Sequence, residues 1–361
     1  MADEIYHKLA QVLDTLPNGF PSTESGVEIK ILKKIFTPAQ AELFCEMRLT
    51  FETVEQVAER TGRPLEELDR QLKDMGKAGQ LFSINLGGIR IFKMLPWVFG
   101  IYEFQLSRLD KELASLVEEY APFFTKQFYS ETPQLMRTLP VEQEISSHQE
   151  VLSYEKASDL IEQNQSFLAN DCICKKEKEL LEHPCNRPVQ VCLALAPVPN
   201  VFDKYPTGKA ITKQEAHDLM KMTEEAGLVH LTYNVQGGGS YICNCCKCCC
   251  GVLRSINELG IPAPMVINSN YYAEIDANQC SSCGLCADER CQVGAIEEGE
   301  DAYRIIRERC IGCGLCISTC PSEAIRLVRK EQDQIVKPPV NEDAWLEERG
   351  LMRGVDFSKY K

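Results

Sequence analysis

Residues 27–100 show the hydrophobic periodicity of three amphipathic helices followed by two short alternating strands. The strands Leu81–Ile84 and Ile89–Phe92 flank Leu86-Gly87-Gly88, a sequence typical of a β-hairpin turn. This order of elements predicts a winged-helix-like domain. Its helices are expected at Pro38–Met47, Thr53–Thr61 and Pro64–Ala78, where Thr53 and Pro64 are typical helix-start residues. Residues 1–26 predict a helix, Tyr6–Leu16, and a polar arm that we expect to lie on a neighbour.

The charges on the third helix bear on DNA binding. A helix that enters the major groove needs a basic surface against the phosphates. Here the charges are mixed: Glu66, Glu67, Asp69 and Asp74 against Arg70, Lys73 and Lys77. We therefore expect a protein-docking or homodimer-forming role for this domain, and do not expect nucleic acid as a partner.

Residues 101–150 predict a long helix and a linker. Leucines recur at helical spacing between Tyr102 and Tyr120, and prolines and polar residues dominate Thr132–His148. Residues 151–270 predict an α/β domain. We expect in it a helix at Ser153–Phe167, a capping box at Thr212 and Glu215 that starts a helix ending at Gly227, and strands at Leu228–Tyr233 and Pro264–Asn268. A Gly-rich loop at 237–240 is not followed by Gly-Lys-Ser/Thr and is not a phosphate loop.

Composition narrows the functional class. The 361 residues include 53 acidic and 39 basic side chains, a net charge of −14 that suits a basic redox partner better than nucleic acid. No apolar run reaches the roughly 18 residues of a membrane span. Of 19 cysteines, 18 lie between Cys172 and Cys320, too close in sequence for a disulfide scaffold, and Met1-Ala-Asp-Glu does not begin a signal peptide. We expect a reducing, anaerobic cytoplasm.

The cysteines of residues 271–330 occur in two similar copies. The second copy, Cys310 to Pro321, matches C-x2-C-x2-C-x3-C-P, in which three thiolates hold one iron–sulfur cube and the fourth ligates the other cluster. Zinc ribbons are the alternative, but they take ligands as two pairs. The spacing therefore predicts two [4Fe-4S] clusters, one bound by Cys280, Cys283, Cys286 and Cys320 and one by Cys310, Cys313, Cys316 and Cys291.

This segment resembles the bacterial two-cluster ferredoxin, but its first copy departs from that pattern. Four residues separate Cys286 from Cys291, one more than usual, and Gln292 stands where proline is expected. We expect the longer loop to leave the cluster that Cys291 shares more solvated or shifted in potential.

Ten further cysteines precede the ferredoxin segment. Six thiols within eight residues have no packing rationale, so we expect this domain to bind metal. One or two further iron–sulfur clusters are favoured, a fused or non-cubane cluster included, with zinc or a redox-active thiol set as alternatives; spacing does not say which cysteine holds which metal. The ten are Cys172, Cys174, Cys185, Cys192, Cys243, Cys245, Cys246, Cys248, Cys249 and Cys250.

Taken together, the chain resembles the multidomain ferredoxin-type proteins of anaerobic bacteria and archaea, with an α+β fold and a polar tail at residues 331–361. The resemblance implies a non-catalytic electron-transfer subunit of an oxidoreductase complex, with a flavoprotein or a heterodisulfide-reductase-like subunit as partner. No nucleotide or flavin fingerprint and no catalytic acid or base is evident. Two alternatives stay open: a redox-sensing transcriptional regulator that uses the winged helix, and a reductase whose middle domain is catalytic.

Overall fold

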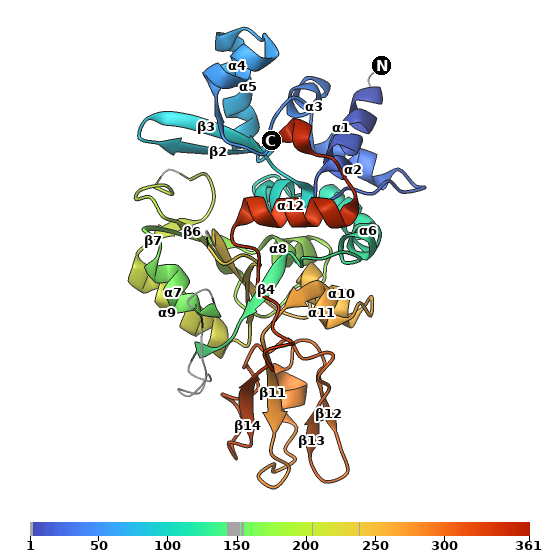
Figure 1. Cartoon of the computed structure of the whole chain (residues 1–361), viewed down its shortest axis with the longest axis vertical. Coiled ribbons are helices and arrows are strands. Elements are labelled where there is room, and N and C mark those ends of the chain that lie inside the picture. The colour runs from blue at the N-terminus through green and yellow to red at the C-terminus, as the bar shows by residue number, and fades with distance from the viewer. Residues whose placement is uncertain (1–2, 143–151, 153–154, 204, 238) are drawn as a thin grey trace.

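The computed structural model describes residues 3–142, 152, 155–203, 205–237 and 239–361. Three regions follow one another along the long axis (Figure 1): a helical N-terminal region, a seven-stranded sheet with its helices, and two small antiparallel strand pairs from residues 271–330. Mixed helices and strands confirm the predicted α+β class. Within the described residues, no helix is both long enough and apolar enough to cross a membrane.

The N-terminal region contains the predicted helices and hairpin. Its three-stranded sheet has the order β1-β3-β2, and β2 and β3 form the expected hairpin. Capping boxes start α3 at Thr37 and α4 at Thr53. The winged-helix class stays a prediction. The elements are α1 (Glu4–Thr15), α2 (Val27–Ile35), α3 (Pro38–Phe44), β1 (Glu52–Thr53), α4 (Val54–Thr61), α5 (Leu65–Lys77), β2 (Leu81–Leu86) and β3 (Ile89–Met94).

The expected long helix from Tyr102 to Tyr120 is wrong in its position. A short 3₁₀ turn (η2, Glu103–Gln105) follows the turn η1 (Trp97–Ile101), and the helix α6 runs from Lys111 to Phe128. The Asp110 side chain caps α6 by accepting from the Leu113 N–H at 2.9 Å, which explains why the helix starts there.

The expected linker at 132–148 is also wrong in part, because β4 (Met136–Leu139) is a strand inside the main sheet. Strand β4 pairs with β8 and β10, and all four of its residues are buried. Residues 143–148 lie outside the described part of the chain.

The main sheet has the order β10-β4-β8-β9-β6-β5-β7. Its remaining strands are β5 (Ser166–Asp171), β6 (Gln190–Ala196), β7 (Lys209–Ile211), β8 (Val229–Tyr233), β9 (Tyr241–Cys245) and β10 (Ile267–Asn268). Helices α7 (Ala157–Glu162) and α9 (Lys213–Glu225) lie on one side, and α8 (Ile173–Leu180) lies towards α6 (Figure 1). Two short helices, α10 (Gly251–Asn257) and α11 (Ala263–Val266), follow β9.

Two predicted elements of this domain differ from the structure. The expected helix 153–167 is only α7, because the buried run from Ser166 enters β5; residues 153 and 154 lie outside the described residues. The expected strand 264–268 is mostly α11, with only Ile267 and Asn268 in β10. The capping box of α9 and strand β8 are confirmed. Gly238 of the Gly-rich loop also lies outside the described residues.

The region 271–330 is built from two antiparallel pairs. Strand β11 (Tyr271–Ile275) pairs with β14 (Ile325–Arg329), and β12 (Ile296–Glu298) pairs with β13 (Tyr303–Ile305). The first pair joins the two ends of the region, so the cysteine segments lie between the strands.

The sequence indicated only a polar tail after residue 330. In the structure this tail contains a helix and packs back against the rest of the chain. Helix α12 (Glu342–Arg353) lies between the main sheet and the N-terminal helices (Figure 1). Its Trp345 is fully buried and donates through Nε1 to the Gln134 carbonyl at 2.9 Å. Beyond it, the Leu49 N–H donates to the Tyr360 carbonyl. The chain therefore clasps its own N-terminal region.

Candidate iron–sulfur and metal sites

The first predicted ligand set lines one cavity. Cys280, Cys283, Cys286 and Cys320 all line one small cavity beside Ile275 and Tyr303. Cys283 is exposed, whereas Cys286 is buried, and burial raises the pKa of Cys286 to about 11. The structure thus brings Cys320 next to three cysteines that precede it by more than thirty residues in sequence.

The second ligand set is more deeply buried. Burial, and then the neighbouring thiols Cys310 and Cys291, raise the pKa of Cys313 to about 12. The pKa of Cys316 is raised well above its usual value, mainly by burial and then by Cys313, Cys310 and Cys291. The assignment of Cys310, Cys313, Cys316 and Cys291 to one cluster stays a prediction.

Backbone N–H groups point at the sulfurs of both sets. The Ala295 N–H donates to Cys291 Sγ at 3.1 Å, and the Ala324 N–H donates to Cys320 Sγ at 3.3 Å. The Ala273 N–H donates to Cys310 Sγ at 3.4 Å. Such donors stabilise thiolates, so the residues fit an anionic iron–sulfur group.

The two copies of the motif share unusual backbone angles. Gly284 and Gly314 stand at equivalent positions with φ of 78° and 81°, where a Cβ would be strained. Ser282 and Gly312 form a second equivalent pair at 52° and 60°, and Gly294 and Glu323 a third at 59° and 51°. Ser282 and Glu323 adopt this conformation without being glycine. The repeat seen in the sequence is therefore a repeat of the backbone as well.

The longer loop does not leave Cys291 exposed to solvent, so the expectation of a more solvated cluster is wrong. A π-helical turn (η5, Cys286–Arg290) absorbs the extra residue, closed by the Cys291 N–H donating to the Cys286 carbonyl at 3.0 Å. Cys291 is 9% exposed and Gln292 is 1% exposed. Asp288 and Glu289 of the loop stay exposed, whereas Cys291 and Gln292 at its end are buried.

Arg290 and Gln292 make the contacts between this loop and the cysteine-rich domain. The Arg290 guanidinium donates to the carbonyls of Glu224 and Glu225 at 3.2 and 3.0 Å, at the end of α9. The Gln292 side-chain oxygen accepts from the Lys247 N–H, inside the run of six cysteines, at 3.0 Å. The two departures from the ferredoxin pattern therefore form a domain interface.

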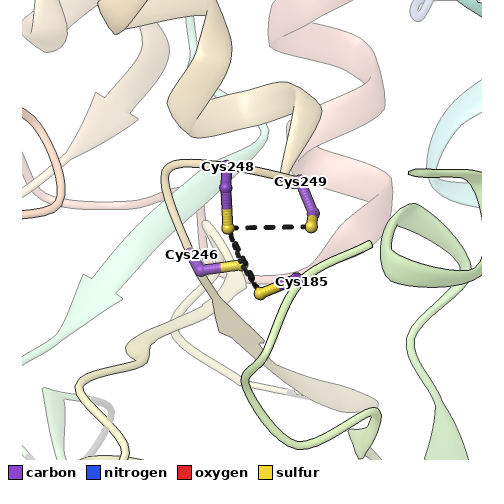
Figure 2. A group of neighbouring side chains, drawn as sticks. All are labelled: Cys185, Cys246, Cys248 and Cys249. Atoms are coloured by element: carbon purple, nitrogen blue, oxygen red, sulfur yellow. Dashed lines mark hydrogen bonds between the residues drawn. The ribbon is translucent and has the colours of Figure 1, made fainter. Parts of the chain in front are cut away.

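The ten cysteines of the middle domain divide into two groups. The four-thiol group has Sγ atoms that all lie within 4.8 Å of one another (Figure 2). Cys248 Sγ lies 3.3 Å from both Cys185 Sγ and Cys246 Sγ and 3.7 Å from Cys249 Sγ. Hydrogen bonds from Cys246 and Cys249 hold the pKa of Cys248 well below its usual value. The group consists of Cys185, Cys246, Cys248 and Cys249.

In the six-thiol group, neighbouring thiols influence one another's pKa values. Cys172 and Cys250 are the residues that precede α8 and α10, and Cys243 and Cys245 lie on one face of β9. Against a lowering hydrogen bond with Cys172, the contact with Cys250 and burial raise the pKa of Cys174 well above its usual value. The neighbouring Cys192 is the largest influence on the raised pKa of Cys243. The group consists of Cys172, Cys174, Cys192, Cys243, Cys245 and Cys250.

Polar groups that the sequence did not single out lie beside the six-thiol group. The Tyr102 hydroxyl donates to the Glu177 carboxylate, and Cys174 adds to the raised pKa of Tyr102. Burial raises the pKa of Glu177 to about 7. Tyr102 begins the segment whose leucine spacing predicted a long helix, and no sequence pattern pointed to Glu177.

The remaining candidates play structural roles. His230 Nδ1 lies 2.6 Å from the Asn244 side-chain oxygen, and burial lowers its pKa to about 4. His183 is exposed, and neither histidine belongs to a group of converging metal-binding side chains among the described residues. Cys45 is buried in the N-terminal core, and burial raises its pKa to about 11.

Comparison with known proteins agrees with the C-terminal site. Residues 303–326 match the family described as 4Fe-4S binding domain. The chain is 28% identical over 98 residues to an iron–sulfur protein of Rhodospirillum rubrum, covering 25% of this chain and 51% of that protein. It thus spans about half the length of that relative.

Two further relatives are named as subunits of redox complexes. Pyruvate synthase subunit PorD of Methanocaldococcus jannaschii is 37% identical over 59 residues, 16% of this chain and 67% of that protein. A subunit of the ion-translocating oxidoreductase complex of Methanosarcina acetivorans is 42% identical over 48 residues, 13% of this chain and 18% of that protein.

Proposed function

Because this chain belongs to the ferredoxin-type proteins that carry a 4Fe-4S binding domain, we propose that it relays single electrons between redox partners within an oxidoreductase complex. One observation carries the proposal: one ligand set opens to the surface, and the other is covered by a second cysteine-rich domain. A bound [4Fe-4S] cluster supplies one-electron oxidation and reduction.

The first ligand set provides the outer contact of this relay. Cys283 is exposed, and the strand pairs of residues 271–330 lie at the end of the molecule that is farthest from the N-terminal helices (Figure 1). A partner can approach this set without displacing another domain. The chain is strongly acidic, so we infer that the docking face of that partner is basic. A flavoprotein or a heterodisulfide-reductase-like subunit is the proposed partner class.

The second ligand set provides the inner contact. The Val141 N–H, just after β4, donates to the Cys313 carbonyl at 3.0 Å, and Gln292 joins the Cys291 loop to Lys247. We propose that Cys310, Cys313, Cys316 and Cys291 hold the inner cluster, and that Cys280, Cys283, Cys286 and Cys320 hold the outer one. The six-thiol group is the proposed site of a further iron–sulfur cluster.

All nineteen cysteines are free thiols, which supports a reducing compartment. We propose that this compartment is the cytoplasm of an anaerobe.

A rapid-mixing experiment on the full chain tests the relay. The anaerobically purified protein is reduced by methyl viologen radical and mixed with cytochrome c, and the reduction of cytochrome c is followed by absorbance. We expect transfer that depends on the protein and that slows at high salt, because the acidic surface steers the basic acceptor. Transfer no faster than with the Cys313→Ala variant would contradict the relay.

A further inference from the structure

We propose that the four-thiol group is a zinc site, in which Cys185, Cys246, Cys248 and Cys249 hold one Zn²⁺ that is separate from all iron–sulfur clusters. For these four thiols the proposal takes the zinc alternative instead of the further iron–sulfur clusters that the sequence favoured. It stands on the geometry of the four sulfurs and does not depend on the electron-relay function.

The separations between the sulfurs match one shared ion. In a tetrahedral site with Zn–S bonds of about 2.3 Å, neighbouring sulfurs lie about 3.8 Å apart. The four measured Sγ–Sγ distances are 3.3, 3.3, 3.7 and 3.8 Å, and every pair lies within 4.8 Å. In Figure 2 the four side chains point toward one common point from two separate loops. These distances are much longer than a disulfide bond of about 2.05 Å.

A cubane requires a wider arrangement. Each of its four thiolates binds a different iron at a corner of the cube, so these sulfurs must lie farther apart than sulfurs that share one ion. The same protein offers the comparison. Among the residues that the structure describes, only the four-thiol group brings three or more metal-binding side chains within 4.8 Å, and the two ferredoxin ligand sets do not.

Neighbouring groups complete a zinc-thiolate environment. The Arg187 N–H donates to Cys185 Sγ at 3.4 Å, and its guanidinium lies 3.9 Å from Cys248 Sγ. These contacts offset the negative charge that four thiolates place around a divalent ion. The Arg187 Nε also donates to the Ala226 carbonyl at the end of α9. Second-sphere N–H donors of this kind orient the ligands and hold them ionised.

The position of the group suits a structural ion. Cys185 follows α8, whereas the other three ligands follow β9 some sixty residues later, and Cys246 and Cys249 are buried with Val191 and Leu228. One ion would therefore join two loops that the backbone leaves unconnected. All four tetrahedral positions are protein thiolates, as in structural zinc sites, and such ligand sets bind Zn²⁺ more tightly than Fe²⁺.

Metal analysis tests the assignment on the full chain purified without oxygen. We expect one zinc per chain, and X-ray absorption at the zinc edge should report four sulfur ligands at about 2.3 Å. The Cys248→Ser variant should lose this zinc and keep its iron content and its EPR signals. The matched Cys313→Ala variant should lose iron and keep its zinc.

Three results would overturn the proposal. The first is wild-type protein without stoichiometric zinc. The second is a loss of about four irons in Cys248→Ser, since that would place a cubane at the site. The third is a zinc-edge spectrum with oxygen or nitrogen ligands, which would place the zinc elsewhere. This spectrum is recorded on the wild-type protein, so it is informative even if a variant fails to fold.

Discussion

The side-chain oxygen of Gln292 accepts a hydrogen bond of 3.0 Å from the backbone N–H of Lys247. Gln292 directly follows the ligand Cys291, and Lys247 lies between Cys246 and Cys248 of the four-thiol group. A proline, which the ferredoxin pattern expects after this cysteine, has no side-chain oxygen to accept this bond. The bond therefore joins the ferredoxin segment to the cysteine-rich domain at the residue where the sequence departs from the family pattern.

Substituting Gln292→Ala should destabilise this contact. The Lys247 N–H would lose its partner, and a partly buried hydrogen bond contributes about 0.5–1.5 kcal/mol to stability. Anaerobic urea unfolding measures the change, and EPR should show that the ferredoxin clusters still assemble. The exposed Gln279→Ala variant is the control and should unfold as the wild type does. Equal stability of Gln292→Ala and wild type would show that the bond does not matter.

The ferredoxin segment could be predicted well from sequence, and the reason is local. Cysteine spacing determines which thiols can share a cube, and the positive φ values repeat at equivalent positions such as Gly284 and Gly314. The burial of Cys291 could not be predicted, because it depends on contacts of Arg290 with the end of α9, about 65 residues away in the chain. From sequence alone, an extra residue in a loop predicts that the loop is exposed to solvent, because the surface that covers it is not known.

The middle domain was predicted less well for a related reason. Strand β4 lies in a segment whose prolines and polar residues indicated a linker, and it is a strand because β8 and β10 flank it. The division of ten cysteines into four and six depends on β-sheet pairing and on which helix each cysteine precedes. Adjacent thiols such as Cys249 and Cys250 belong to different groups, which sequence spacing alone does not reveal.

Removing one ligand should disable the ferredoxin segment. Cys313→Ala should lose one EPR signal of the reduced protein and part of its iron, because a segment of this size has little core without its clusters. Iron analysis and EPR of the dithionite-reduced protein measure this. Cys45→Ala should change neither, since Cys45 is buried away from both ligand sets. An unchanged spectrum in Cys313→Ala would refute the ligand assignment.

Glu118 joins α8 and α10, the helices that directly follow Cys172 and Cys250. Its carboxylate accepts from Arg254 of α10 at 2.7 and 3.0 Å and from Lys178 of α8 at 2.7 Å. The Arg254 hydrogen bonds, against the opposing effect of burial and with help from Lys178, lower its pKa to about 2. The folded-state pKa is below the unfolded value, so this network stabilises the protein above about pH 4.5 and loses its effect as the pH falls toward 2.

The Glu118→Gln variant should therefore be less stable at pH 7, by an amount on the order of 1–2 kcal/mol after allowance for its partial exposure. The difference from wild type should shrink below about pH 4.5, as anaerobic urea unfolding at several pH values would measure. Glu112→Gln, on the exposed side of the same helix, is the control and should change stability by less than about 0.5 kcal/mol. A difference that grows at low pH would contradict the assignment.

The N-terminal region should bind duplex DNA weakly and without sequence preference. Two of the three cations of α5 are paired within the helix, Lys73 with Asp69 and Lys77 with Asp74, so few cations are free to contact phosphates. Fluorescence anisotropy with labelled random and promoter duplexes at low salt measures this. Tight binding to one promoter that changes on cluster oxidation would instead support a redox-sensing regulator.

Quantitative EPR during a reductive titration tests the electron-transfer account most directly. The full chain, purified without oxygen, is titrated with dithionite, and the spins are integrated at each step. The account predicts at least two one-electron centres per chain, with signals broadened by their mutual interaction because both ligand sets lie within one small segment. A chain with all eight ferredoxin cysteines intact that yields no EPR-active reduced centre would contradict it.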